Sequence, residues 1–306
     1  MMAGLVVTQV LNGLQYGVLL FLLAAGLTLI FGIMDFVNLA HGSLYMLGAF
    51  FTAAALGATG SFLLALAIAV PATVATGVLV DRVVLAGLYS RTHLDQVLAT
   101  FGLVLFFNEL VVIVWGSSPL YAEVPDALSG TVQLFGFNYS SYRFAIIGVG
   151  LGVAVFLWWL INRTRIGMLI RAGASNAPMV SALGVDIRRL NMMIFGLGAG
   201  LAGLAGAMMA PIFSVQSGMG DSVLIQTLVV IIVGGIGSIR GAFLAALIIG
   251  VVDTIGKVFL PIWMGSLVSG NVAQAAGPAI ASMLVYLLMA IVLAFKPGGL
   301  FPVRRG

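Results

Sequence analysis

The chain has no cysteine and very little charge. Of its 306 residues only 7% are Asp, Glu, Lys or Arg, whereas 62% are hydrophobic. A soluble domain carries about 25% charged residues, so this chain cannot cover a water-facing surface. Without cysteine, disulfides and thiolate metal sites are excluded. The composition therefore predicts an integral membrane protein.

Histidine and catalytic motifs are almost as scarce. His41 and His93 are the only histidines, and neither has a second histidine at the spacing of metal ligands. No G-x-S-x-G nucleophile motif occurs. The stretch GVVDTIGKV (250–258) departs from an ATP-binding P-loop, because Val251 replaces its first glycine and Val258 follows its lysine. We expect no catalytic residue, no metal and no cofactor, and any dependence on ATP requires a partner.

Long apolar runs, by contrast, are plentiful. A membrane-spanning helix needs about 20 mostly apolar residues. The runs predict an all-α, polytopic helical bundle of about eight to nine transmembrane or half-membrane helices, with residues 1–306 forming a single transmembrane domain. The two runs that meet near Arg240 could instead form short or broken helices. The expected segments are 9–33, 38–58, 61–80, 94–115, 142–162, 191–213, 222–239, 241–261 and 276–296.

Charge between the runs predicts the topology. Because positive residues stay in the cytoplasm, we expect the basic stretch 163–190 and the C-terminus inside, and the acidic stretch 116–141 outside. Nine segments then place the N-terminus outside, whereas a re-entrant 38–58 places it inside. The C-terminal tail carries Lys296, Arg304 and Arg305. The net charge of +4 follows this topology and does not indicate nucleic acid binding.

Three polar residues interrupt the stretch IMDFVNLAHGSLYMLGAF (33–50). They are Asp35, Asn38 and His41, and Gly42 follows them. In a helical junction Asn38 and His41 lie near one face, and Gly42 permits close backbone approach. Three roles are open: hydrogen bonds that hold a broken helix junction and sense closure of a pathway, a purely structural cap, or direct contact with a solute.

Two carboxylates fall within other apolar runs. Glu109, next to Asn108, lies mid-run, where a charge costs at least about 2.5–3.5 kcal/mol and marks a functional candidate. The alternative is a helix–helix hydrogen bond. Asp253 has the same two interpretations. Together with Asp35, these carboxylates leave open an ion- or proton-coupled secondary transporter that works without ATPase partners.

Glycine is concentrated in two stretches. Gly198, Gly200 and Gly203 match a dinucleotide-binding pattern by letter, but they stand in an apolar helix, where small residues let helices pack closely. The stretch VGGIGSIRGAF (233–243) is either a tight inner turn or a pathway element, because glycine-rich backbone at membrane depth must be buried or line a water-filled cavity. Its candidate residues are Gly234, Gly235, Gly237 and Ser238.

The basic stretch 163–190 predicts a short helix. Ser175 or Asn176 can cap it, Pro178 suits its first turn, and Gly184 ends it. Such a helix, held between two spans, can dock into a groove on a cytoplasmic partner. A solvated loop that only sets topology is the alternative.

Four stretches, in order along nearly the whole chain, resemble the membrane permease subunits of the high-affinity branched-chain amino acid ABC transporter family. They are residues 12–50 with the pattern N-x-A-H-G, 164–185 ending in A-L-G-V, 196–212, and 233–250 with the pattern G-G-x-G-S. The second is similar to the family's ATPase-docking loop, which implies docking roles for Ala172, Met179, Ala182 and Gly184.

The resemblance implies a permease in a bacterial inner membrane that takes part in ATP-driven import. An external binding protein delivers the solute, a second related permease completes the pathway, and two cytoplasmic ATPases bind the ATP. The implied solute is a branched-chain amino acid or a related small polar solute such as an amide, urea or another amino acid.

Overall fold

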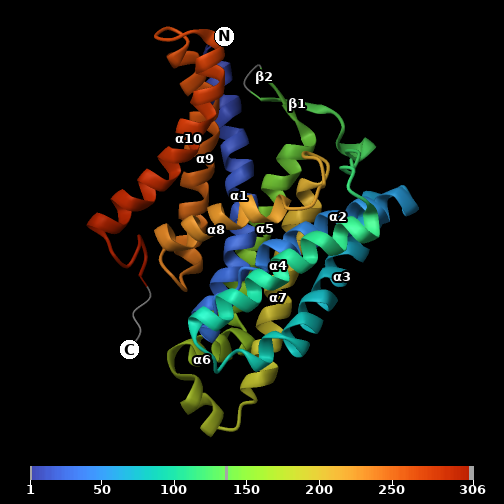
Figure 1. The fold of residues 1–306 in the computed structure, drawn as a ribbon, viewed down its shortest axis with the longest axis vertical. Helices are drawn as coiled ribbons and strands as arrows, with labels where there is room; N and C mark the ends of the chain where they lie inside the picture. Colours follow the sequence, from blue (N-terminus) through green and yellow to red (C-terminus); the bar gives the residue numbers. More distant parts are fainter. Residues whose placement is uncertain (1, 135–136, 303–306) are drawn as a thin grey trace.

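The computed structural model describes residues 2–134 and 137–302, and helices dominate it (Figure 1). The helices are α1 Met2–Met34, α2 His41–Thr59, α3 Phe62–Val83, α4 His93–Trp115, α5 Ser141–Arg163, α6 Arg165–Ala182, α7 Ile187–Met209, α8 Met219–Gly234, α9 Ile239–Met264 and α10 Gly270–Phe295. Short 3-10 helices cover Leu85–Gly87 and Asp126–Leu128, and strands β1 Thr131–Leu134 and β2 Phe137–Ser140 form one antiparallel hairpin.

Among the described residues, eight helices are long and apolar enough to cross a membrane, as the polytopic bundle requires. Helix α6 and helix α8 are not among these eight; α6 was not expected to span, whereas α8 was, and it has only 16 residues. At 1.5 Å per residue it measures about 24 Å, less than the roughly 30 Å of a bilayer's hydrocarbon core. It runs across α1 rather than alongside it (Figure 1). The full span expected at 222–239 is therefore wrong, and the short helix left open near Arg240 is what forms.

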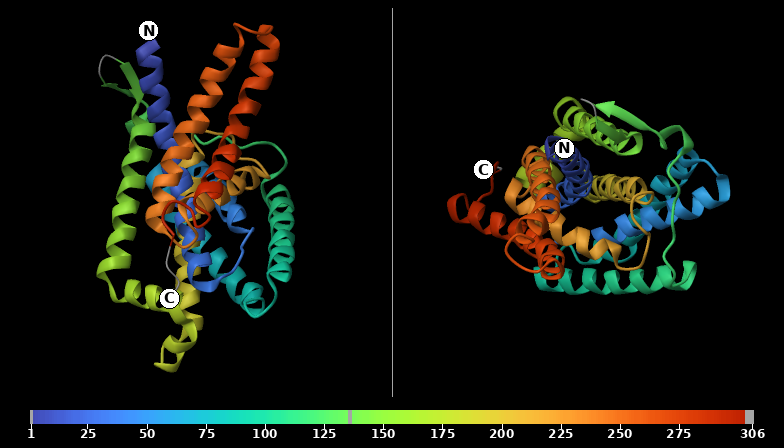
Figure 2. Two further views of the ribbon diagram at one scale, coloured as in Figure 1. Left: turned by 90° about the vertical axis from the view of Figure 1, so that its left-hand side faces the viewer. Right: turned by 90° about the horizontal axis from the view of Figure 1, so that it is seen from above.

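Helix α1 lies at the centre of the molecule and contacts α5, α7, α8 and α9 (Figure 2). It carries no acidic residue in its first turn and no basic residue in its last turn, and its most apolar window is 78% buried. A helix that is apolar on all sides is stable when either lipid or other helices cover it, and for α1 other helices do so. Helix α1 is therefore the core around which the other helices assemble.

Small residues set the distance between the packed helices. A Cβ on Gly17 of α1 would lie 2.6 Å from the carbonyl oxygen of Ala246 on α9, and a Cβ on Gly203 of α7 would lie 2.7 Å from Thr73 of α3. Gly77 of α3 likewise faces Ala199 of α7. These contacts confirm the packing interpretation of the glycine stretch in α7, since a larger side chain would separate the helices.

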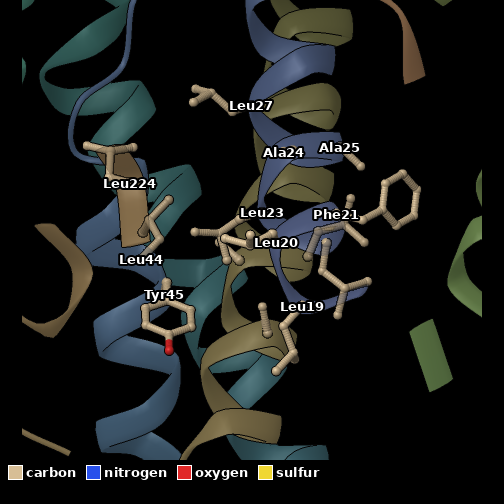
Figure 3. Close-up of a cluster of buried hydrophobic side chains, with 14 of the residues drawn as sticks. Leu19, Leu20, Phe21, Leu23, Ala24, Ala25, Leu27, Leu44, Tyr45 and Leu224 are labelled. Atoms are coloured by element: carbon tan, nitrogen blue, oxygen red, sulfur yellow. The ribbon is translucent and has the colours of Figure 1, made fainter. Parts of the chain in front are cut away.

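A buried apolar cluster joins the central helix to its short neighbours. Leu44 and Tyr45 of α2 and Leu224 of α8 lie beside Leu20 and Leu23 of α1 (Figure 3). The first ten residues of α2 are buried, although α2 begins only after a break in the chain. Helix α2 therefore starts inside the bundle.

The two ends of the molecule differ in charge. The N-terminal end of α1 lies beside the β1–β2 hairpin, which belongs to the acidic stretch, whereas α6, in the basic stretch, lies at the opposite end (Figures 1 and 2). This is the separation that the charge pattern predicts. Arg304 and Arg305 lie outside the described residues.

Candidate functional site

The first candidate site is the junction between α1 and α2. Helix α1 ends at Met34, Asp35 adopts a left-handed backbone with φ of 48°, and α2 begins at His41. Left-handed backbone is uncommon outside glycine, although Asp is among the residues that tolerate it. The broken helix expected here is present, and it turns the chain back into the bundle.

The junction separates the three polar residues that the sequence places together. Asp35 is exposed, whereas Asn38 and His41 are 1% and 0% exposed. Asp35 therefore does not share an environment with the other two, and the expected three-residue cluster is wrong in this conformation.

Asn38, His41 and Ser43 have no hydrogen bond to their buried side-chain atoms among the described residues. The carbonyl of Leu23 lies beside the imidazole, but the geometry falls short of a hydrogen bond. The N-cap residue of α2 is Ala40, and no side chain caps the helix. Asn38 therefore does not cap α2, and the side-chain hydrogen bonds expected of Asn38 and His41 are absent among the described residues.

His41 occupies the crossing of α1 and α7. A Cβ on Gly26 of α1 would lie 3.0 Å from Nε2 of His41 and 2.9 Å from the carbonyl oxygen of Gly198 on α7. The imidazole fits there only because residue 26 has no side chain. Movement of α1 against α7 would therefore change the surroundings of His41 directly.

Gly42 makes the close backbone approach that was expected of it. A Cβ at this position would lie 2.6 Å from the carbonyl oxygen of Gly220, in the first turn of α8. Gly218, which precedes α8, has φ of 79°. The N-terminal ends of two half-buried elements, α2 and α8, thus meet inside the bundle.

An aromatic residue anchors the junction to the turn after α3. Phe36 is fully buried, and its ring meets that of Tyr89 edge to face, with centroids 5.3 Å apart. The hydroxyl of Tyr89 donates a hydrogen bond to Asp81 of α3, which is 5% exposed. Sequence reasoning missed this series of contacts, although an acidic residue at the end of an apolar run was a signal for it.

The polar pair in α4 divides between two roles. The side-chain amide of Asn108 donates a hydrogen bond of 3.1 Å to Asp221 of α8, and its backbone carbonyl oxygen accepts one from the hydroxyl of Ser217. Glu109 instead lies on the exposed face of α4. The helix–helix hydrogen bond therefore belongs to Asn108, and Glu109 faces away from the chain's own core.

Asp253 of α9 is buried and ion-paired. Its carboxylate lies 2.6 Å from the ammonium of Lys257, one helical turn on, and its side chain is 3% exposed. A polar contact that sequence reasoning did not identify lies nearby, where the hydroxyl of Tyr16 bonds to Gln226. The ion pair lies within α9, so it is not the helix–helix hydrogen bond that the structural interpretation expected of Asp253.

The G-G-x-G-S stretch forms a tight turn between α8 and α9. Gly235 and Gly237 have φ of 104° and 84°, and Ser238 caps α9 by accepting from the amide of Gly241. Gly234 packs on the backbone of Gly241, and its carbonyl oxygen accepts from the amide of Phe301. A tight turn is present as expected, although α8, one of the two helices that it joins, is too short to span a membrane. The C-terminal segment closes over this turn.

The short helix of the basic stretch is the second candidate site. Helix α6 kinks at Asn176, whose backbone is non-helical and whose Oδ1 accepts from the amide of Met179. Gly184 ends the helix with φ of 87°, and the amide of Val185 donates to the carbonyl of Val180, as in a Schellman motif. The predicted cap and terminus are both confirmed.

The docking residues divide at this kink. Met179 is 59% exposed, and Ala182 and Gly184 are exposed beside it. Ala172 precedes the kink and is half-buried. The segment 177–184 therefore presents three of the four candidate residues on one short projecting helix. Among the described residues no group of acidic or histidine side chains is placed to hold a metal ion.

Comparison with known proteins agrees with these features. A family model described as "Branched-chain amino acid transport system / permease component" matches residues 9–294. The permease protein BraD of the high-affinity branched-chain amino acid transport system of Pseudomonas aeruginosa is 28% identical over 95% of this chain and 94% of its own. The corresponding LivH proteins of Salmonella typhimurium and Escherichia coli K12 are 28% and 26% identical over 82% of this chain and 86% of theirs. No solved structure matches the chain significantly.

Proposed function

This chain belongs to the family of permease components of branched-chain amino acid transport systems, and from that premise we propose that it carries branched-chain amino acids, or a related small polar solute, into the cell. The observation that carries the proposal is the family match over residues 9–294, supported by relatives named for that transport that align over 86–94% of their own length. Such a permease is a transport subunit of an ABC system and has no ATPase domain of its own.

ABC permeases work with ATPases and a solute-binding protein. For this chain we propose two cytoplasmic ATPases, a second related permease and an external binding protein. The projecting segment 177–184 supports the ATPase contact, because it is capped at both ends and exposes Met179 at its surface. A rigid, capped helix transmits displacement better than a flexible loop does.

The chain is a multi-pass membrane protein, and we propose the bacterial inner membrane as its location. Residues 1–306 then form one transmembrane domain with the C-terminus and 163–190 in the cytoplasm and the N-terminus outside. The placement of acidic and basic stretches at opposite ends supports this orientation. Because the chain has no cysteine, single cysteines at Asp126 and Ser181 can report their sides through a membrane-impermeant maleimide.

We propose that Asn38 and His41 sense closure of the pathway. Each buried polar group without a partner costs about 1–3 kcal/mol, so a second conformation that supplies partners is favoured by the same amount. Their position at the meeting point of α1, α2 and α7 supports a gating role over direct contact with the solute, because both side chains are closed to solvent here. Asp35 and Gly42 belong to the same hinge.

Two further candidates have weaker support as pathway elements. Glu109 is exposed on an apolar helix, and a carboxylate at membrane depth requires a water-filled path or a protein neighbour to offset its cost. The turn formed by Gly234, Gly235, Gly237 and Ser238 connects the half-length helix α8 to α9, and we propose that it carries motion between them.

The test is a pull-down of the chain in mild detergent from cells that express the neighbouring genes. We expect two ATPases and a sister permease to copurify with it. The variant Ala182→Arg places a charge on the docking helix and should lose only the ATPases. The control Tyr121→Arg changes an exposed residue of the acidic stretch 116–141 and should keep them.

The alternative is an ion- or proton-coupled secondary transporter. If the chain purifies alone and drives leucine uptake into proteoliposomes in a proton gradient without ATP, the importer proposal is wrong. Uptake that needs ATP and the binding protein supports it, and competition by valine, urea and acetamide then ranks the solutes.

A further inference from the structure

A cavity of about 990 Å³ opens between α1, α5, the first half of α6 and the α8–α9 turn. Its walls are strongly apolar, and Trp158 of α5 and Phe243 of α9 belong to them. Gly32 and Gly237 approach closely at one side, where a Cβ on Gly32 would lie 3.1 Å from the α-carbon of Gly237. Of the candidate gating and docking residues, only Gly237 and Ser238 of the turn line this cavity, so the roles proposed above do not account for it.

The polar residues of the cavity are gathered toward the end that carries α6, and they are basic or neutral. Arg171 of α6 and Arg240 at the start of α9 are its charged residues, and no acidic residue is among the described residues that line it. Asn162, Ser175 and Ser238 add hydroxyl and amide groups. The mouth therefore favours an anion, and the positive end of α9 adds to the effect of the two guanidinium groups.

The apolar part has the length of one membrane leaflet. Along α1 the cavity extends from Phe21 to Ile33, and along α5 from Leu151 to Asn162. At 1.5 Å per residue these stretches measure about 18 Å and about 17 Å. Half of a bilayer's hydrocarbon core is about 15 Å thick, so the cavity accommodates an acyl chain from the level of the basic residues to the middle of the membrane.

We propose that this cavity binds an anionic phospholipid of the leaflet on the α6 side. The phosphate and acidic headgroup bind Arg171 and Arg240, and an acyl chain lies against α1 and α5. Because Arg171 is on the same helix as the kink at Asn176, lipid bound here steadies the base of the projecting segment 177–184. The site is independent of which solute the permease carries. A helix of a partner protein is the competing occupant, and the apolar groove with a purely basic mouth favours the lipid.

The experiment uses Trp158 as a reporter. The chain, and separately the assembled transporter, are placed in nanodiscs of phosphatidylcholine that contain a minor fraction of acyl-brominated phosphatidylglycerol or acyl-brominated phosphatidylcholine. Bromine quenches tryptophan on contact, and the quenching lost in Trp158→Phe is the part that belongs to the cavity. We expect phosphatidylglycerol to quench Trp158 at a several-fold lower fraction than phosphatidylcholine does.

Charge variants test the headgroup site. Arg171→Gln and Arg240→Gln should each raise the required fraction of phosphatidylglycerol about fivefold, while Arg91→Gln, a basic residue outside the cavity, should leave it unchanged. Ala154→Phe narrows the apolar wall and should weaken both lipids equally. Equal quenching by both lipids, insensitive to the arginine variants, overturns the proposal. Loss of quenching in the assembled transporter also overturns it, because a protein partner then fills the groove.

Discussion

Gly42 and Gly220 pack backbone against backbone where α2 and α8 begin. A Cβ on Gly42 would lie 2.6 Å from the carbonyl oxygen of Gly220, and a Cβ on Gly220 would overlap the carbonyl of Gly42. Neither helix can move aside freely, because both are buried at this point. The two glycines thus allow two discontinuous helices to start at one place inside the bundle.

Gly220→Ala should therefore lower the stability of the purified chain by roughly 1–3 kcal/mol, the usual cost of overpacking. Thermal unfolding in detergent measures the change. Gly57→Ala is the matched control, because it lies in α2 with open space around it, and it should be neutral or stabilising by up to about 1 kcal/mol. Similar losses in both variants would show that the close approach is not the cause.

His41→Ala tests the gating proposal. We expect normal assembly with the partner subunits and at least about tenfold slower uptake. Without the imidazole, the second conformation no longer gains the hydrogen bonds that would favour it. Ser43→Ala removes a neighbouring hydroxyl without a partner and should leave stability unchanged or higher. If His41→Ala prevents assembly instead, the residue has a structural role and the proposal fails.

Tyr89→Phe tests the anchor of the junction. It removes the hydrogen bond to Asp81 but keeps the ring against Phe36, and it should cost about 1–3 kcal/mol, because the buried carboxyl then loses its partner. Combining it with Asp81→Asn in a double-mutant cycle isolates the bond. Additive losses in the cycle would mean that the two side chains are not coupled.

Gly184→Ala tests the end of the docking helix. Its φ of 87° is disfavoured for alanine, although nothing crowds the position, so we expect a cost of about 1–2 kcal/mol that is confined to the end of the segment. Hydrogen exchange of the amides of 177–185 should rise, and copurification of the ATPases should fall. Gly87→Ala, a glycine with open space and ordinary backbone, is the control.

Lys257→Met tests whether Asp253 is structural. Removing one partner of a buried ion pair leaves an uncompensated charge and lowers the free energy of unfolding by roughly 3–5 kcal/mol. Because Lys257 is partly exposed, this range is an upper limit here. The double variant Asp253→Asn with Lys257→Met should recover much of that loss. A double variant that stays stable yet abolishes uptake would instead assign Asp253 to transport.

The elements that sequence reasoning located well are those with a strong local signal. The runs 94–115 and 142–162 differ from α4 and α5 by one residue at most at each end, because apolar length and flanking polar residues determine them. The cap at Asn176 and the terminus at Gly184 were predicted for the same reason, since side-chain capping and positive φ are properties of a few neighbouring residues.

The environments of the polar residues were not predictable in the same way. Asp35 and His41 are six positions apart, yet one is exposed and the other is completely buried. Asn108 and Glu109 are adjacent, yet only Asn108 meets Asp221. Which face of a helix is covered depends on neighbours that come from distant parts of the chain, and an almost uniformly apolar helix gives no amphipathic pattern from which to infer it.

The sequence by itself determined that this chain is a bundle of apolar helices with one basic and one acidic end, because too little charge and too many long apolar runs permit nothing else. Only the tertiary structure decided that α8 lies across the bundle, that α2 begins inside it, and that Arg171 and Arg240 share the mouth of one cavity. Those outcomes depend on close contacts between residues such as Gly42 and Gly220, which lie far apart in the sequence and meet only when the helices pack.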